Sequence, residues 1–210
     1  MSNFFTPTSK DSDWNCVRES LFTLKSLMLL QGFKYPEDFK VFRVPVTFHN
    51  PNGYILTIEI GRKPVTKPVL VLIHGFCGSN FFFLKMFKEL AKTFHIYAID
   101  IYGMGLSYKW DFKSKDWESS MKMMTESINE WVKFWNLQNF FILGYSLGGY
   151  ILMHYLNRFR PKLKGVFILS APGFVSPEEA GEEFVKEHVQ KYIGDSKSWV
   201  SNGMSKLMYN

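Results

Sequence analysis

Cysteines are scarce in this sequence, and long apolar runs are missing. The only two cysteines, Cys16 and Cys77, lie far apart and show no metal-ligand spacing, so neither a disulfide framework nor a cysteine-based metal site is expected. No window holds about 18 uncharged apolar residues, which excludes an obvious transmembrane helix. The first residues, MSNFFTPTSKDSD, carry acidic side chains and no apolar core, unlike a secretory or transit peptide. Together these absences predict a soluble, cytoplasmic protein.

Clusters of arginine and lysine interleaved with aromatic residues are also missing. The net charge is +6, and the excess of positive charge lies between Val41 and Gly173, a segment with sixteen basic and eight acidic residues. Without a recognisable motif, this excess does not indicate nucleic-acid binding. An ordinary solvated surface is favoured over contact with anionic lipid headgroups.

Hydrophobic residues make up 46% of the chain and aromatic residues 18%, which is typical of one globular domain with a substantial core. The domain begins with an amphipathic helix, because apolar residues recur at three- and four-residue steps after Ser12 and Asp13, and Gly32 follows as a stop signal. The apolar positions are Trp14, Val17, Leu21, Leu24 and Met28. This stripe can pack on its own sheet, or enter a lipid interface with Arg18 and Lys25 at the level of the headgroups.

Alternating residues then predict a β-hairpin, FKVFRVPVTFH and YILTIEI, joined by the turn residues Pro51-Asn52-Gly53. After the hairpin, short apolar runs alternate with helical patterns. The runs are VLVLIH, HIYAID, NFFIL and LKGVFIL, and the helices are expected at 84–94, at 117–135 and directly after Ser146. Short strands that are apolar on both faces and separated by helices predict a mostly parallel sheet covered on both sides.

One serine interrupts the apolar stretch FFILGYSLGGYILMHYL. GYSLG matches G-x-S-x-G directly after a predicted strand and directly before a predicted helix. A nucleophilic serine on such a strained turn needs small neighbours, which Gly144 and Gly148 supply beside Tyr145. The alternative is that Ser146 only caps the helix.

Two further motifs favour the catalytic interpretation. His74-Gly75-Phe76-Cys77-Gly78 follows the VLVLI strand, at the position that contributes the second N–H of an oxyanion hole. The predicted pair of donors is the N–H of Phe76 and the N–H of Leu147. Residues 100–107, DIYGMGLS, follow the next strand and supply a tight glycine turn near the same edge.

At these motifs the sequence resembles the α/β-hydrolase superfamily, and more narrowly the group of α/β-hydrolase-domain proteins 4 and 5 and the cardiolipin deacylases. The resemblance extends from about Trp14 to Phe174 and rests on HGFCGS, AIDIYGMGLS, SINEWVKFWNLQNFFILGYSLGGY and ILSAPGF. It implies an α/β-hydrolase fold with the six first strands in residues 38–173, preceded by the helix segment 1–37 and followed by the start of a helical lid in 174–210.

The resemblance also implies a function. Serine members of this group hydrolyse acyl esters of phospholipids or lysophospholipids, so Ser146 is expected to attack a lipid ester and form an acyl-enzyme. No metal or organic cofactor is expected. GMGLSY is not a dinucleotide fingerprint, because Tyr108 replaces the third glycine of G-x-G-x-x-G. The implied partners are a lipid ester and a peripheral membrane or lipid-droplet surface.

The acid and histidine of a triad should follow the serine, at the ends of two later strands. His154 lies about 12 Å along the helix from Ser146, too far for a hydrogen bond, and is expected to pack on the helix. His188 is the one histidine in the lid. His95 and Asp100 spell H-x-x-x-x-D, a spacing found in acyltransferases of this group, but they span one strand and the match is attributed to chance.

The chain therefore resembles a C-terminally truncated enzyme whose LKGVFIL strand forms an unpaired edge. Two functions are left open. The first is a serine hydrolase of lipid esters, and the second is a non-catalytic module that binds a lipid surface or a protein and lacks a complete triad.

Overall fold

The computed structural model describes residues 13–61, 64–109 and 116–172, with side chains described from Arg18 onward. The expected lid in 174–210, including His188, lies outside the described residues, as does the side chain of Trp14.

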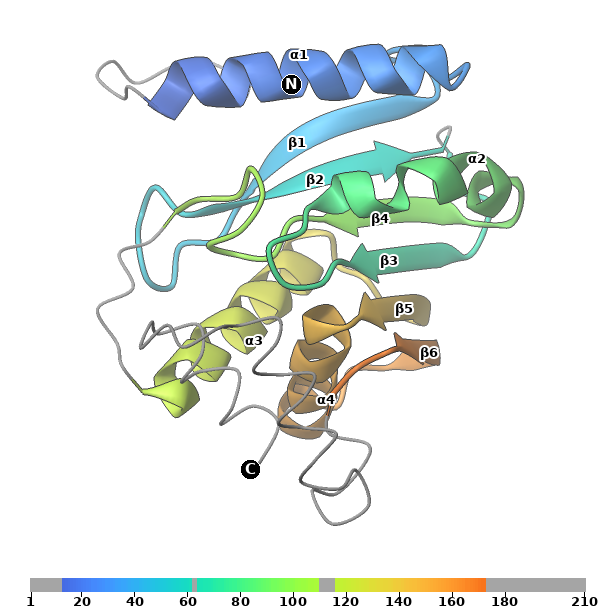
Figure 1. The fold of residues 1–210 in the computed structure, drawn as a ribbon. Coiled ribbons are helices and arrows are strands. Elements are labelled where there is room, and N and C mark those ends of the chain that lie inside the picture. Colours follow the sequence, from blue (N-terminus) through green and yellow to red (C-terminus); the bar gives the residue numbers. More distant parts are fainter. Residues whose placement is uncertain (1–12, 62–63, 110–115, 173–210) are drawn as a thin grey trace, which may run out of the picture.

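Six strands form one sheet in the order β1-β2-β4-β3-β5-β6 (Figure 1). Strand β1 pairs antiparallel with β2, and β2 pairs antiparallel with β4, whereas β3, β4, β5 and β6 run parallel. The predicted hairpin and the parallel sheet are therefore confirmed. The strands are β1 (Phe39–Pro45), β2 (Tyr54–Ile60), β3 (Val69–Ile73), β4 (His95–Ile99), β5 (Phe140–Tyr145) and β6 (Leu163–Leu169).

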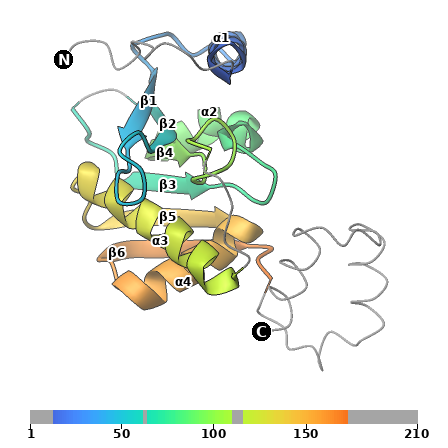
Figure 2. The ribbon, with the colours of Figure 1, turned by 90° about the vertical axis from the view of Figure 1, so that its left-hand side faces the viewer.

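Helices cover both faces of the sheet, as the apolar strands require. One core lies between the sheet and the helices α1 and α2, and a second lies between the sheet and the helices α3 and α4. Figure 2 shows α1 at the β1 end of the molecule and α4 beside β5 and β6. The helices are α1 (Asp13–Leu30), the 3₁₀ turn η1 (Asn80–Phe83), α2 (Leu84–Thr93), α3 (Trp117–Phe134) and α4 (Leu147–Phe159).

Helix α1 packs one apolar stripe on the sheet and exposes another. Leu21, Leu24 and Met28 are buried in the core shared with α2, which fits the packing alternative for this stripe. A different set of side chains, Phe22 and Leu30, is 73% and 81% exposed. Within the described part of the chain, no helix is long and apolar enough to cross a membrane.

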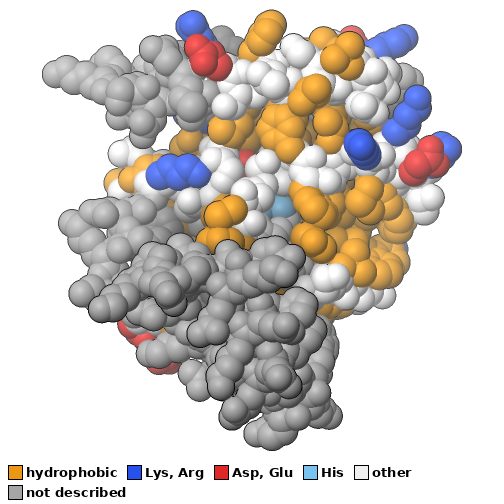
Figure 3. Space-filling model, viewed as in Figure 1, with side chains coloured by type: hydrophobic (Ala, Val, Ile, Leu, Met, Phe, Trp, Pro, Cys, Tyr) orange, Lys and Arg blue, Asp and Glu red, His pale blue; other side chains and the backbone are white. Residues whose placement is uncertain are grey.

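Among the described strands, β6 lies at one side of the sheet and has exposed apolar side chains. Phe167 is 44% exposed and Leu169 is 43% exposed. Leu169 pairs with Tyr145 of β5, and Phe167 lies two residues before Leu169 on β6. Since alternate residues of a strand share a face, both side chains lie on the same face of the sheet as Phe141 and Tyr145. Figure 3 shows apolar side chains gathered on the face of the molecule that carries α1 and α2.

The parallel strands bring three loops to one edge of the sheet. Strands β3, β4 and β5 end at Ile73, Ile99 and Tyr145, so the segments that begin with His74, Asp100 and Ser146 leave from the same side. We call this side of the sheet, where β3, β4 and β5 end, the carboxyl edge. It holds the site residues predicted from the sequence.

Candidate active site

Ser146 occupies the turn between β5 and α4 in a strained conformation. Its φ of 51° and ψ of −121° lie outside the regions that non-glycine residues favour. The Ser146 N–H donates to Leu169 O over 2.8 Å, which ties the turn to the end of β6. Ser146 is the N-cap residue of α4, but its side chain makes no capping hydrogen bond, which contradicts the alternative that the hydroxyl satisfies the first-turn N–H groups. The hydroxyl is therefore held at the sheet edge without a helix-capping role.

Two glycines let the turn close. A Cβ on Gly144 would lie 2.6 Å from Gly148 O, and a Cβ on Gly148 would lie 2.5 Å from Ile73 O. Both contacts are with backbone atoms, which cannot rotate away as a side chain can. The spacing of G-x-S-x-G thus reflects close backbone packing between α4 and the strands on which it sits.

The loop after β3 packs against the same turn. A Cβ on Gly75 would approach Ser146 Cβ to 3.0 Å, so little space separates the two segments. Gly78 N–H donates to Gly75 O over 3.1 Å and closes a tight turn in which Cys77 has a φ of 51°. Within the described residues, neither the Phe76 N–H nor the Leu147 N–H donates a hydrogen bond. These are the two groups that the sequence selected as oxyanion donors.

His74 connects the loops after β3 and β4. Ile101 N–H donates to His74 Nε2 over 3.0 Å, so Nε2 is the acceptor and Nδ1 carries the proton, which it donates to Gly75 O over 2.7 Å. Burial lowers the pKa of His74 to about 4, helped by the positive charge of Lys109 and opposed by the hydrogen bond to Gly75. His74 is therefore neutral at pH 7 and orders the loop.

Asp100 is fully buried below the same loops. It accepts hydrogen bonds of 2.6 Å from Asn80 N–H and Leu106 N–H, one from each loop. Burial raises the pKa of Asp100 to about 6, against the lowering effect of these two donors. Gly105 has a φ of +54°, and a Cβ there would collide with the Asp100 carboxylate. The glycine turn therefore closes around a buried acid, a role that its sequence pattern does not reveal.

Neither His95 nor His154 contacts Ser146. His95 begins β4 at the opposite edge of the sheet and lies 3.0 Å from Glu59, which confirms that H-x-x-x-x-D here spans a strand. His154 packs on Tyr150 with a centroid distance of 4.7 Å, as expected for a helix residue. The Ser146 hydroxyl has no hydrogen-bond partner among the residues that the structure describes.

No group of three or more histidine, cysteine, aspartate or glutamate side chains within the described residues is arranged to hold a metal ion. The arrangement at the carboxyl edge instead consists of a serine, unpaired backbone N–H groups and a loop network ordered by His74 and Asp100. That combination suits acyl transfer, in which a hydroxyl attacks a carbonyl and N–H groups stabilise the resulting oxyanion.

The strand order and the turn at Ser146 define an α/β-hydrolase. Solved structures support this fold at low sequence identity. A membrane phospholipase A described as a bacterial virulence factor superposes with a TM-score of 0.61 at 22% identity, covering 85% of this chain and 50% of that one. The naproxen esterase (carboxylesterase NP) from Bacillus subtilis superposes with a TM-score of 0.62 at 19% identity, covering 94% and 61%.

The chain belongs to the Hydrolase_4 family, described as serine aminopeptidase S33, which matches residues 64–207. It is 32% identical to a 1-acylglycerol-3-phosphate O-acyltransferase of Arabidopsis thaliana over 155 residues, which are 73% of this chain and 37% of the relative. It is 31% identical to the 1-acylglycerol-3-phosphate O-acyltransferase ABHD5 of Rattus norvegicus over 140 residues, which are 66% of this chain and 39% of the relative. The chain thus spans less than half the length of these curated relatives.

Sequence reasoning missed the surroundings of the serine. It did not predict that α1 would lie beside the loops after β3 and β4, nor that Lys109 would line a groove there. No local pattern carries this information, since Thr23 and Lys109 are distant in the sequence and line the same groove only because of the fold.

Proposed function

We propose that this protein is a serine hydrolase of lipid acyl esters in which Ser146 is the nucleophile. The observation that carries the proposal is the conformation of Ser146, whose φ of 51° holds the hydroxyl at the carboxyl edge without a capping bond. Strain of this kind costs about 1–3 kcal/mol and is retained mostly where function requires it.

In the proposed reaction, Ser146 Oγ loses its proton to a base and forms a bond with the acyl carbonyl carbon. The carbonyl oxygen becomes an oxyanion, which the N–H groups of Phe76 and Leu147 stabilise. Collapse of this intermediate breaks the ester bond, and the alcohol leaves with a proton from the protonated base. Water then attacks the acyl-enzyme in the same way and releases the carboxylic acid.

The base and its acid partner are proposed to come from segments that follow β6, as the chain order serine, acid, histidine requires in this fold. His74 is not proposed as the base, because both ring nitrogens are hydrogen-bonded to backbone groups. His154 is likewise excluded, because it packs on Tyr150 and Trp117.

The relatives favour a lipid substrate. Those from Arabidopsis thaliana and Rattus norvegicus are named for acyl transfer to 1-acylglycerol 3-phosphate. The same acyl-enzyme can react with a lipid hydroxyl in place of water, so acyl transfer is a second outcome of the proposed chemistry. The ratio of hydrolysis to acyl transfer depends on whether water or a lipid hydroxyl reaches the acyl group on Ser146.

Contact with a lipid surface is proposed through α1. Phe22, Leu29 and Leu30 are exposed, and Lys25 lies on the same helix, an arrangement that suits the interface of an anionic membrane or lipid droplet. Co-sedimentation of the full chain with anionic vesicles checks this placement. Phe22→Ser with Leu30→Ser should reduce the bound fraction severalfold, whereas binding that is unchanged in the double variant contradicts it.

A non-catalytic lipid-binding module is the second candidate. It is favoured by one observation, which is that the Ser146 hydroxyl has no hydrogen-bond partner within the described residues. A working nucleophile normally has a base within hydrogen-bond reach, although such bonds are often longer in unliganded enzymes.

A fluorophosphonate probe separates the two candidates, because it labels serines that react as nucleophiles. We expect labelling of the folded chain that Ser146→Ala abolishes. Ser119→Ala, at an exposed position on α3, is the matched control and should label like the wild type. Folded protein that is not labelled, or labelling that survives Ser146→Ala, would reject the hydrolase proposal.

A further inference from the structure

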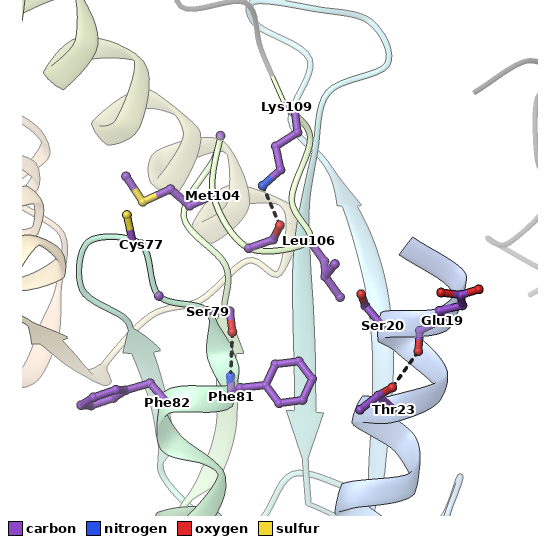
Figure 4. A pocket seen from close by; sticks show the side chains of 13 residues that line it. Glu19, Ser20, Thr23, Cys77, Ser79, Phe81, Phe82, Met104, Leu106 and Lys109 are labelled. Atoms are coloured by element: carbon purple, nitrogen blue, oxygen red, sulfur yellow. Dashed lines mark hydrogen bonds between the residues drawn. The ribbon is translucent and has the colours of Figure 1, made fainter. Parts of the chain in front are cut away.

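A groove separates α1 from the loops that follow β3 and β4. Its volume is about 1010 Å³, at the upper end of the range for small-molecule sites. Its two walls differ in character. Phe81 and Leu106 point from the loop side towards α1, which provides the hydroxyl groups of Ser20 and Thr23 (Figure 4). Phe82 also lines the groove, but its ring points away from α1.

The groove does not include Ser146 itself, but two of its lining residues belong to the surroundings of the candidate nucleophile. Phe82 lines the groove and stacks on Tyr145, the residue directly before Ser146, with a centroid distance of 4.3 Å and an interplanar angle of 18°. Cys77 also lines the groove, and it belongs to the turn whose Gly75 packs against Ser146. A ligand in the groove would therefore contact residues that pack against the strand-to-helix turn.

Charge is distributed unevenly in the groove. Among the described residues that line it, Lys109 is the only cation and Glu19 is the only anion. Lys109 Nζ donates to Gly105 O over 2.6 Å, which uses one of its three N–H donors and fixes the ammonium group at the loop side (Figure 4). Glu19 comes from α1, on the other wall.

We propose that this groove binds the anionic headgroup of a single-chain lipid, with Lys109 on the phosphate and Phe81, Phe82 and Leu106 along the start of the chain. The apolar wall suits a hydrocarbon portion. The Lys109 ammonium already interacts electrostatically with the buried Asp100, but beyond its bond to Gly105 O it has two further N–H donors for an anionic group. The assignment of this lipid as a substrate rests on the proposed function, whereas its binding does not.

Equilibrium binding to the Ser146→Ala chain tests the proposal without turnover. The probes are 1-oleoyl lysophosphatidate and 1-oleoyl lysophosphatidylcholine, each below its micelle concentration, measured by calorimetry. Lysophosphatidate is expected to bind about tenfold more tightly, as one charge-assisted contact at a partly exposed site allows. Lys109→Gln should remove this preference, and Lys109→Arg should keep most of it.

Two further variants distinguish a headgroup site from a merely structural lysine. Glu19→Gln should tighten lysophosphatidate binding about two- to threefold, because it removes a nearby like charge. Lys88→Gln, at an exposed position of α2 outside the groove, is the matched control and should change nothing. A lysine that only holds Gly105 O predicts no effect of Glu19→Gln and equal losses for both lipids in Lys109→Gln.

Equal affinity for the two lipids, or a preference that survives Lys109→Gln, overturns the proposal. Inorganic phosphate that binds as tightly as lysophosphatidate would also overturn it, because the apolar wall would then contribute nothing. Since these measurements use the Ser146→Ala chain, a failure here is distinct from a failure of fluorophosphonate labelling.

Discussion

Two buried histidine–carboxylate clusters lie at opposite edges of the same sheet, and they are bonded in different ways. At the carboxyl edge, His74 and Asp100 bond to backbone groups of the loops after β3 and β4. At the amino edge, His95 and Tyr97 both bond to the Glu59 side chain, over 3.0 and 3.1 Å. The first cluster orders loops, and the second joins the side chains of β2 and β4. Similar residue types thus serve the candidate site at one edge and the strands at the other.

Of the substitutions at the carboxyl edge, one that blocks the close packing at the Ser146 turn should reduce stability most. In Gly148→Ala, the new Cβ meets Ile73 O at 2.5 Å and also collides with His74 O, so the free energy of unfolding should fall by more than about 3 kcal/mol. Chemical denaturation measures the loss. The matched control is Gly32→Ala, where φ is +84° but no atom lies within 4 Å, and the cost should be only about 1–2 kcal/mol. Equal losses would show that the packing at Gly148 is not tight.

Removing one histidine from each cluster tests the comparison directly. His74→Gln and His95→Gln should each reduce the free energy of unfolding by about 2–3 kcal/mol, because each leaves buried polar groups with fewer partners. Their effects on fluorophosphonate labelling should differ. At a temperature where both variants are folded, His74→Gln should slow labelling at least about tenfold, because loss of one oxyanion-hole donor costs about 10²–10³ and a displaced loop would lose part of that.

His95→Gln should leave the labelling rate within about twofold of the wild type, because its cluster does not contact the loops at the carboxyl edge. If both variants slow labelling equally, the division of roles between the two edges is wrong.

Acid should weaken the carboxyl edge through His74. The pKa of His74 is lowered from 6.5 to about 4 in the folded state, so the neutral form is favoured by folding. The resulting stabilisation is present above pH 6.5 and is lost as the pH falls towards 4, by about 3 kcal/mol from the difference between the two pKa values. Asp100 acts in the opposite direction, because its pKa is raised to about 6 and folding favours its protonated form.

The contribution of His74 is therefore read as the difference between wild type and His74→Gln in denaturation curves from pH 7 to pH 4. The wild type should lose more stability than the variant over this range. Identical pH profiles would contradict a buried, neutral imidazole.

The smallest expected effect concerns Cys77. Its φ of 51° is a conformation that glycine adopts without strain, so Cys77→Gly should raise the free energy of unfolding by up to about 1 kcal/mol. Thermal unfolding should then shift upward by about 2–4 °C. Cys77→Ala keeps the strain and should show no gain, so equal behaviour of the two variants would argue against strain at this position.

Most of the elements could be predicted because their signals are local. The apolar runs at β3, β4 and β5 are bounded by turn residues, and α2 ends within one residue of its predicted position. The expected strand 39–49 ends earlier, at Pro45, and one further bond, from Val46 N–H to Gly53 O, closes the hairpin. The order of the strands was not predicted, because periodicity describes single strands and not their neighbours.

In the candidate site too, features with a local sequence signal could be predicted and features that depend on distant segments could not. Ser146 and its glycines follow from G-x-S-x-G in its strand-to-helix context, because a close backbone approach restricts which residues fit. The bonds of Asp100 and the groove at Lys109 depend on contacts between distant segments, which leave no short pattern. The exposed stripe of α1 was missed as well, since Phe22 and Leu30 flank the buried stripe and the helix is apolar on both sides.

Tandem mass spectrometry of the chain after fluorophosphonate treatment tests the central claim most directly, because it identifies the atom that reacts. The account predicts a single phosphonate adduct on Ser146, within the peptide that joins β5 to α4. An adduct on another serine or on Cys77, with Ser146 unmodified in folded protein, would contradict it.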